Sequence, residues 1–364
     1  MTDNRMQKKR DYSLDLIRSI AILGVVLNHA VEFTYPIISP EKMATFSLAK
    51  QILCYSCFVI GRGGVPLFFM LTGYLLLPRE YDVKKAGEFF KYKFVRLLIV
   101  WELWILIYQI FLSWYNQQPV LPQEYLKRAL FLENAGLSHT WYMPAIIGMY
   151  LFIPFVAIAL RSMNGKTLGI LMTVCYFYVF VTPVVSLYLT SVDRPEIENQ
   201  LSLSFGGGMY GFYVIMGYLS AKYKNQIKEK MSSRIMRILT LSAGIISFSL
   251  TVWMQIYLTN AEIKYSVWYN NAFLPLTAIC LFSLLKNVEL KPIAAGFVSQ
   301  ISKCSFGIFC VHELVLLPLL GIIGEKSHNY QKLTILFTGT FVISFIIVKL
   351  LGMIPKVKTL FLMK

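Results

Sequence analysis

Four ionisable side chains stand in one apolar stretch near the start of the chain: Asp15, Arg18, His29 and Glu32. Asp15 and Arg18 are three residues apart, which allows an ion pair on one side of a helix. At 100° per residue, Arg18 and His29 lie within about 20° of the same face and about 16 Å apart along the axis. Because a neutral imidazole suits a general base, one helix stripe combines a cation with a candidate base.

Further ionisable residues stand in apolar surroundings. His139 precedes an apolar run, and His312 and Glu313 lie inside another. Such groups are costly in a membrane and by default indicate function. His328 follows that second run in a polar loop, where we expect it to be solvated.

A second cluster of charge lies in the segment PREYDVKKAGEFFKYKFVRLL. Lys91, Lys93 and Arg96 fall within two helical turns, and Lys93 and Arg96 share a face. Such cations can hold phosphate oxygens. The alternative is a solvated anchor that touches lipid head groups.

The composition shows what must position these residues. The 364-residue chain is 56% hydrophobic and 15% charged, with a mean hydropathy of +0.58. Apolar runs of about 18 to 25 residues recur throughout, as in integral membrane proteins. We therefore predict an all-α polytopic fold, with one membrane domain over residues 1–364 and a first helix that is retained, since no small-residue cleavage site follows it.

Ten membrane spans are predicted, with both termini in the cytoplasm. They lie near 14–34, 48–77, 94–115, 140–160, 167–190, 205–222, 238–259, 268–286, 302–320 and 332–353. Most of the 35 Lys and Arg residues then fall on the cytoplasmic side, notably in the basic loops 78–96 and 222–237. The net charge of +16 thus reflects topology rather than nucleic-acid binding.

The second span is interrupted by Arg62, Gly63, Gly64 and Pro66. Freed backbone groups there must face other helices or a water-filled cavity. Arg62 either finds an anion or carbonyl within the protein or extends to the outer surface.

Several other chemistries find no support in the sequence. All six cysteines lie in or beside apolar runs, and Cys54 and Cys57 form a CxxC without a second pair. No HExxH or GxSxG motif occurs, so we expect no metal site and no serine hydrolase.

The predicted topology places His29, His139 and His312 toward the outer side, whereas Arg18, Lys93 and Arg96 gather at the inner surface. This polarity favours group transfer across the membrane, from a phosphorylated cytoplasmic donor to a hydroxyl on the other side. The scheme predicts a continuous polar tunnel between Arg18 and His29.

The spacing of Asp15, Arg18 and His29 resembles the signature of the acyltransferase-3 family of membrane acyltransferases. Four later segments resemble this family in the same order: GVPLFFMLTGYLL (64–76), KYKFVR (91–96), HTWYMPAIIGMYLFIPF (139–155) and SFGIFCVHELV (305–315). The short length and the WYxxxxIGxYLxxPF pattern are most similar to surface-polysaccharide O-acyltransferases without a periplasmic domain.

The resemblance implies transfer of an acyl group, usually acetyl, from cytoplasmic acyl-CoA to a hydroxyl of an envelope glycan or its lipid-linked precursor. It implies a protein of the bacterial cytoplasmic membrane, with acetyl-CoA as co-substrate and no tightly bound cofactor. The oligomeric state stays open.

The resemblance also suggests roles for individual residues. His29 becomes the base or acyl relay, acting with Arg18 and Asp15. Donor binding falls to the cations Lys91, Lys93, Arg96 and Arg62, with Lys93 where Arg is common.

The acceptor side or the proton path falls to His312, Glu313, His139, Trp141 and Glu32. Alternatives remain for three of these residues. Glu32 orients His29 or simply contacts water; His312 serves the acceptor or links helices; Trp141 contributes to the site or anchors the membrane interface.

A different class of protein would use the same polar residues. A transporter for an amino acid or an envelope precursor would employ them as a permeation path. A non-catalytic scaffold would leave the burial of Asp15, Arg18, His29 and His312 unexplained. Transfer of acetyl from acetyl-CoA by the purified protein separates the enzyme from both alternatives.

Overall fold

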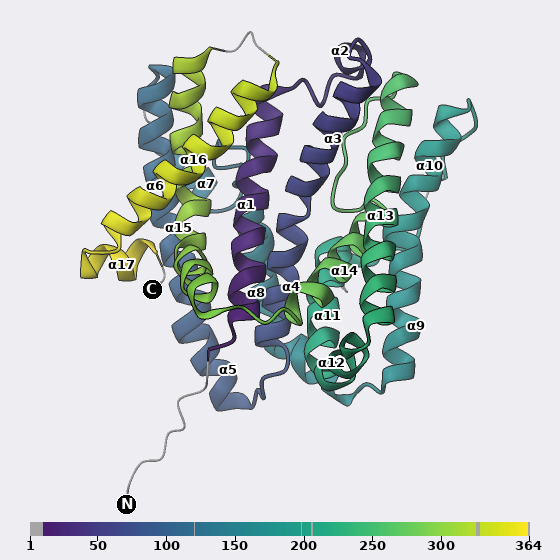
Figure 1. Ribbon diagram of the computed structural model, residues 1–364. Helices are drawn as coiled ribbons and strands as arrows, with labels where there is room; N and C mark the ends of the chain where they lie inside the picture. Colours follow the sequence, from purple (N-terminus) through teal and green to yellow (C-terminus); the bar gives the residue numbers. More distant parts are fainter. Residues whose placement is uncertain (1–9, 120, 198, 205–206, 325–327, 363–364) are drawn as a thin grey trace, which may run out of the picture.

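The computed structural model describes residues 10–119, 121–197, 199–204, 207–324 and 328–362, and these ranges contain helices but no strand (Figure 1). The helices are α1 (Tyr12–Thr34), α2 (Pro40–Ala44), α3 (Leu48–Arg62), α4 (Gly64–Leu76), α5 (Val83–Phe89), α6 (Val95–Asn116), α7 (Pro122–Ala129), α8 (Tyr142–Ser162), α9 (Gly165–Tyr176), α10 (Thr182–Ser191), α11 (Gly208–Lys222), α12 (Lys224–Ser232), α13 (Arg234–Asn260), α14 (Leu274–Lys286), α15 (Pro292–Ile323), α16 (Tyr330–Leu351) and α17 (Pro355–Phe361). Short π-helical segments, Phe90–Phe94 and Phe177–Val181, join α5 to α6 and α9 to α10.

Eight helical segments of the described chain are long and apolar enough to cross a membrane. The prediction of an all-α polytopic membrane protein is therefore confirmed. The other two predicted spans coincide with α11 and α14, which have 15 and 13 residues. Since a full crossing needs about 20 residues, these helices fill only part of the bilayer's depth. Residues 205–206 of the predicted sixth span lie outside the described residues.

An irregular segment, residues 261–273, fills the depth that α14 leaves open (Figure 1). The buried Gln255 holds it, because its Oε1 accepts from Val267 N at 2.7 Å and its Nε2 donates to the carbonyl of Tyr265 at 2.9 Å. Asn271 Oδ1 then accepts from Phe273 N at 2.9 Å and from the N–H of Leu274, the first residue of α14, at 3.2 Å. Non-helical backbone is tolerated at such depth when protein satisfies its polar groups.

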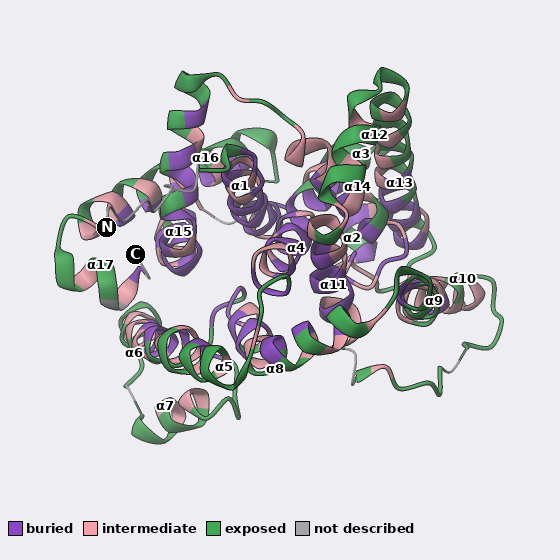
Figure 2. Cartoon of the chain, turned by 90° about the horizontal axis from the view of Figure 1, so that it is seen from below, coloured by how far each residue is buried: buried purple, intermediate pink, exposed green. Residues whose placement is uncertain are grey.

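Helix α1 runs through the middle of the bundle, between α15 and the α3–α4 pair (Figure 2). Its buried positions include Ile17, Ile22, Val26 and Ala30, each without exposed surface. We call the end of the bundle where α1 begins the N-terminal face, and the end where α1 finishes the opposite face.

The predicted interruption of the second span is the boundary between α3 and α4. It is a single residue, Gly63, whose dihedral angles (φ −62°, ψ −20°) remain helical, so the two helices continue in nearly one direction. At this boundary the backbone of α1 directly contacts the backbone of α3 and α4. If a Cβ were added to Gly61, it would lie 2.7 Å from Asn28 Cα, and a Cβ added to Gly64 would lie 2.5 Å from the Ala21 carbonyl oxygen. The small residues thus seat α1 against this boundary.

Helices α4 and α11 approach even more closely. A Cβ on Gly73 would lie 1.8 Å from the Val214 carbonyl oxygen, and a Cβ on Gly217 would lie 1.9 Å from that of Met70. Such contacts between small residues are the usual way in which membrane helices gain packing energy.

We expect Gly217→Ala to disrupt the bundle, because its methyl group would collide with backbone rather than with a flexible side chain. Overpacking typically costs about 1–3 kcal/mol, and a backbone collision should reach the upper end of this range. The measurement is the yield and thermal stability of the detergent-purified protein by size-exclusion chromatography. Gly169→Ala in α9 is the matched control, since nothing lies within 4 Å of its added Cβ. Equal stability of the two variants would contradict the proposed packing.

Candidate active site

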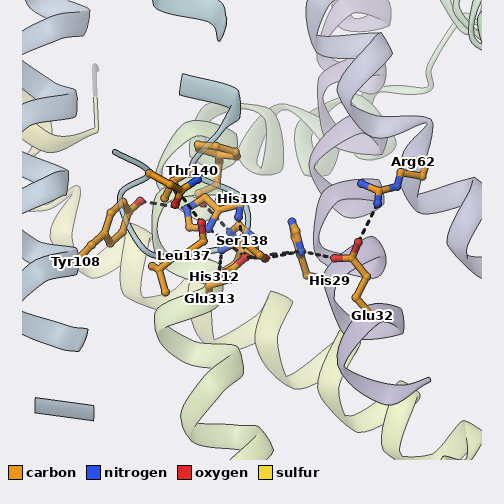
Figure 3. A network of polar contacts seen from close by, with 12 residues as sticks. His29, Glu32, Arg62, Tyr108, Leu137, Ser138, His139, Thr140, His312 and Glu313 are labelled. Atoms are coloured by element: carbon orange, nitrogen blue, oxygen red, sulfur yellow. Dashed lines mark hydrogen bonds and ion pairs between the residues drawn. The ribbon is translucent and has the colours of Figure 1, made fainter. Parts of the chain in front are cut away.

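At the opposite face, the end of α1 brings three ionisable side chains into a row (Figure 3). Arg62 Nη2 donates to Glu32 Oε1 at 2.9 Å, and Glu32 Oε2 lies 2.8 Å from His29 Nδ1. His29 and Arg62 are buried, whereas the Glu32 side chain is 25% exposed. Of the two alternatives for Glu32, the structure therefore shows the one in which it contacts and orients His29.

This row fixes the tautomer of His29. Glu32 is paired with a guanidinium, so its oxygens act as acceptors and His29 Nδ1 must carry the proton that lies between them. The lone pair of the neutral ring is then on Nε2. Since the ring also lines a cavity, the arrangement presents an oriented base to whatever enters that cavity.

Glu313 anchors the segment before α8 to α15. Its buried carboxylate accepts from Ser138 N at 2.9 Å and His139 N at 3.0 Å, and also from the Ser138 hydroxyl. The same hydroxyl lies 3.1 Å from His29 Nδ1, so it joins the carboxylate to the base (Figure 3). Ser138 is exposed, which brings this network to the surface of the molecule.

His139 and His312 complete the cluster, with ring centroids 4.6 Å apart, and His312 lies 5.3 Å from His29. His312 Nδ1 faces the Phe309 carbonyl at 2.6 Å and therefore carries a proton. The Tyr108 hydroxyl donates to the Cys310 carbonyl at 2.9 Å, so His139 Nε2, 3.2 Å from it, must be the donor in that contact. Two ring nitrogens, His312 Nε2 and His139 Nδ1, then have no hydrogen-bond partner among the described residues.

His29, His312 and Glu313 also place possible metal ligands within 4.8 Å of one another. However, Glu313 already accepts three hydrogen bonds from Ser138 and His139, and His29 Nδ1 faces Glu32. The donor set is thus engaged in orienting the loop and the base, and acid–base chemistry accounts for it directly.

A small cavity of about 10 Å³, room for about one water-sized group, lies beside His29. Its lining residues are Val25, Asn28, His29, Gly61, Arg62, Val65, His139, Trp141, Tyr142, Tyr269 and Phe309. Arg18 is not among these lining residues, so this cavity by itself is not the predicted tunnel, which stays a prediction. Val25 and Phe309, both buried and apolar, line the cavity and precede His29 and His312 on their helices by about one turn, on the side toward Arg18.

At the N-terminal end of α1, Asp15 is the centre of a second network. It accepts from Arg10 Nε at 2.5 Å and from Ser302 Oγ at 2.6 Å, and it lies 3.6 Å from Arg18 Nη1. Arg18 Nη1 also donates to Ser302 Oγ at 3.1 Å. The predicted Asp15–Arg18 pair is thus present, and it is connected to α15.

Two further cations, Arg79 in the loop after α4 and Lys93 in the π-helical segment, are connected to Arg18 through neighbours. Lys93 interacts electrostatically with Arg79, and the partly buried Tyr150 interacts with both Arg79 and Arg18. Arg96 instead donates to the Thr359 carbonyl of α17 at 3.2 Å. Lys91 is exposed, with its ammonium 5.3 Å from the Tyr92 ring centre.

The predicted residues therefore divide into two groups. The His29 group contains Glu32, His139, Trp141, His312 and Glu313, as the sequence indicated. Arg62 belongs to this group as well, contrary to its predicted place with the donor-binding cations, because it lies at the α3–α4 boundary toward the opposite face. It finds an anion within the protein rather than extending to the surface.

Sequence reasoning missed several contacts at both sites. Ser138, Tyr108, Asn28, Arg79, Tyr150 and Ser302 were not singled out. For Ser138 a signal existed, since it directly precedes His139 and Trp141 in the segment that resembles the family. The others are ordinary in their local sequence, and only the packing of the helices around α1 gives them significance.

Comparison with known proteins supplies the family. The model of the acyltransferase-3 family, described as an acyltransferase domain, matches residues 11–353. No curated protein and no solved structure matches the chain significantly. Since the matched region contains both polar networks and nearly all of the helices, the chain belongs to the acyltransferase-3 family and is a multi-pass membrane acyltransferase.

Proposed function

We propose that the protein transfers an acyl group, most simply acetyl, from acyl-CoA to a hydroxyl of a cell-surface glycan or its lipid-linked precursor. The N-terminal face would lie in the cytoplasm of a bacterial cell and the opposite face outside the cytoplasmic membrane. One domain, residues 1–364, would carry both the donor site and the acceptor site. The observation that carries the proposal is the Arg62–Glu32–His29 row, which holds a base beside a cavity deep in the bundle.

The chemistry requires one proton acceptor at the point where donor and acceptor meet. In the proposed step His29 Nε2 takes the proton of the acceptor hydroxyl while the oxygen of that hydroxyl forms a bond to the thioester carbonyl carbon. The carbon–sulfur bond breaks, and the CoA thiolate leaves with a proton returned by the imidazolium. Glu32 would stabilise the imidazolium through Nδ1–H, as carboxylates do in hydrolase triads.

The donor would bind at the N-terminal face, where Arg18, Arg79 and Lys93 provide positive charge for the phosphates of CoA. About 16 Å separates Arg18 from His29 along α1, and an extended acyl carrier arm would bridge this distance. Val25 and Phe309 lie in the path. Their side chains, or the helices that carry them, must therefore move when the donor enters.

His29→Ala should abolish transfer, because the base is lost without loss of the donor site. General base catalysis contributes about 10²–10⁴-fold, so we expect a rate decrease of at least about 10². The measurement is formation of an acetylated glycan in membranes given labelled acetyl-CoA, normalised to protein level. His328→Ala, in the loop after α15, is the control. Full activity of a correctly inserted His29→Ala protein would refute the mechanism.

Glu32→Gln should reduce the rate while it preserves the shape of the side chain. The amide cannot stabilise an imidazolium and can present its NH₂ group to Nδ1, which would favour the wrong tautomer. We expect a decrease of about 10²-fold or more in kcat, with little change in the KM for acetyl-CoA. Glu41→Gln, in α2, removes another acidic group and should be neutral. A change confined to KM would argue against an orienting role.

Arg79→Ala and Lys93→Ala should weaken donor binding instead. Each removes one positive charge near Arg18, so the KM for acetyl-CoA should rise about 5- to 50-fold, most strongly at low salt, with a smaller effect on kcat. Lys230→Ala in α12 is a control for general surface charge. If the two variants and the control behave alike, the donor phosphates bind elsewhere.

A further inference from the structure

The cavity beside His29 contains polar atoms that the protein leaves unpaired. Asn28 Oδ1 and Arg62 Nε are buried, and within the described ranges neither has a hydrogen-bond partner. Both residues line this cavity. Since an unsatisfied buried group costs about 1–3 kcal/mol, two such atoms around one cavity indicate a place for a polar ligand.

The next feature is a cluster of aromatic rings beside the same cavity. Trp141, which lines it, stacks on Tyr210 with centroids 5.5 Å apart and an interplanar angle of 23°. Its ring also lies 5.2 Å from Trp268 and 5.2 Å from Tyr269. Tyr269 is buried, whereas Trp141, Tyr210 and Trp268 are partly exposed.

Arg62 joins these rings to the base. Its guanidinium carbon lies 4.7 Å from the Trp268 ring centre and 4.6 Å from that of Phe58, which are distances typical of cation–π contacts. Arg62 Nη1 donates to the Tyr269 hydroxyl at 3.3 Å, and Nη2 binds Glu32. One side chain therefore fixes the aromatic cluster relative to His29.

We propose that Trp141 and Trp268 form a stacking surface for a neutral sugar ring of the acceptor, with Asn28 Oδ1 and Arg62 Nε as partners for its hydroxyls. This assignment rests on the proposed function, and it specifies the acceptor half of that site. The cavity itself admits one hydroxyl-sized group, which is the group that must reach His29. The rest of the ring would lie against the partly exposed tryptophans.

The charges favour a neutral ring over an anionic group. Glu32 pairs with Arg62 at 2.9 Å, and Glu313 lies 3.2 Å from His139 Nδ1, so two carboxylates already lie at the site. A phosphate or a uronate would add negative charge next to these two acids. An apolar ligand would leave Asn28 Oδ1 and Arg62 Nε unpaired. A sugar ring has apolar faces for the tryptophans and hydroxyls that both donate and accept.

The backbone provides the reason why Trp268 can reach this place. It belongs to the irregular segment 261–273, which fills the depth above the short helix α14. A full-length helix could not present Trp268 and Tyr269, which are adjacent in sequence, to the same guanidinium. The segment is thus a candidate specificity element, held by Gln255 and Asn271.

The test uses the full-length protein in detergent with acetyl-CoA and three neutral probes: the methyl glycosides of glucose, galactose and N-acetylglucosamine. Wild-type protein should acetylate at least one of them. Trp268→Ala should raise the KM for that glycoside about tenfold or more, with a much smaller change in the KM for acetyl-CoA. Trp268→Phe keeps an aromatic face and should change the acceptor KM less than about threefold. Trp253→Ala, on the exposed side of α13, is the matched control.

A second readout does not require turnover. The glycoside that serves as acceptor should alter the tryptophan fluorescence of the wild-type protein, and Trp268→Phe should reduce this change to the part that Trp141 contributes. If Trp268→Ala does not fold, this measurement on Trp268→Phe decides the matter.

Three results would overturn the assignment. They are an unchanged acceptor KM in a folded Trp268→Ala protein, equal losses toward donor and acceptor, or donor turnover by the wild type with no transfer to any of the three glycosides. A wild-type protein that releases no CoA, with or without acceptor, would instead contradict the proposed function. The two failures are therefore distinguishable.

Discussion

The contact between Arg62 and Glu32 is the interaction on which the rest of the site depends. A buried guanidinium is tolerated only when it is paired, and removal of one partner of such a pair typically costs about 3–5 kcal/mol. Here the partner carboxylate also faces His29, so the pair that satisfies Arg62 orients the ring as well. The same guanidinium packs between Phe58 and Trp268, which ties the site to α3 and to segment 261–273.

The architecture supplies the space for this arrangement. Two helices, α11 and α14, are too short to cross the bilayer, and the irregular segment 261–273 occupies the depth beyond α14. Adjacent residues of a regular helix point in different directions, whereas segment 261–273 presents the neighbouring Trp268 and Tyr269 to one guanidinium. Close packing of glycines between α4 and α11 holds α11 in place.

Much of the fold and of the candidate site was predictable from the sequence, because a membrane restricts the structures that a chain can form. Long apolar runs indicate spanning helices, and charged residues within them are rare enough to mark His29, Arg62 and His312 directly. The depth to which a helix extends in the membrane and the direction in which a side chain points are harder to predict. Hydropathy alone did not distinguish the short helices α11 and α14 from full spans, and it could not show that Arg62 faces Glu32 rather than the donor. Ser138 and Tyr150 have ordinary sequence surroundings and gain importance only from their contacts.

In the proposed mechanism, donor and acceptor bind at opposite faces with His29 between them, and a sided assay tests this most directly. Protein reconstituted in vesicles would receive acetyl-CoA trapped only in the lumen and an acceptor glycoside only outside. We expect acetylated glycoside in the external medium, formed by the wild-type protein and absent with His29→Ala. Transfer that occurs only when both substrates are on the same side would contradict this mechanism.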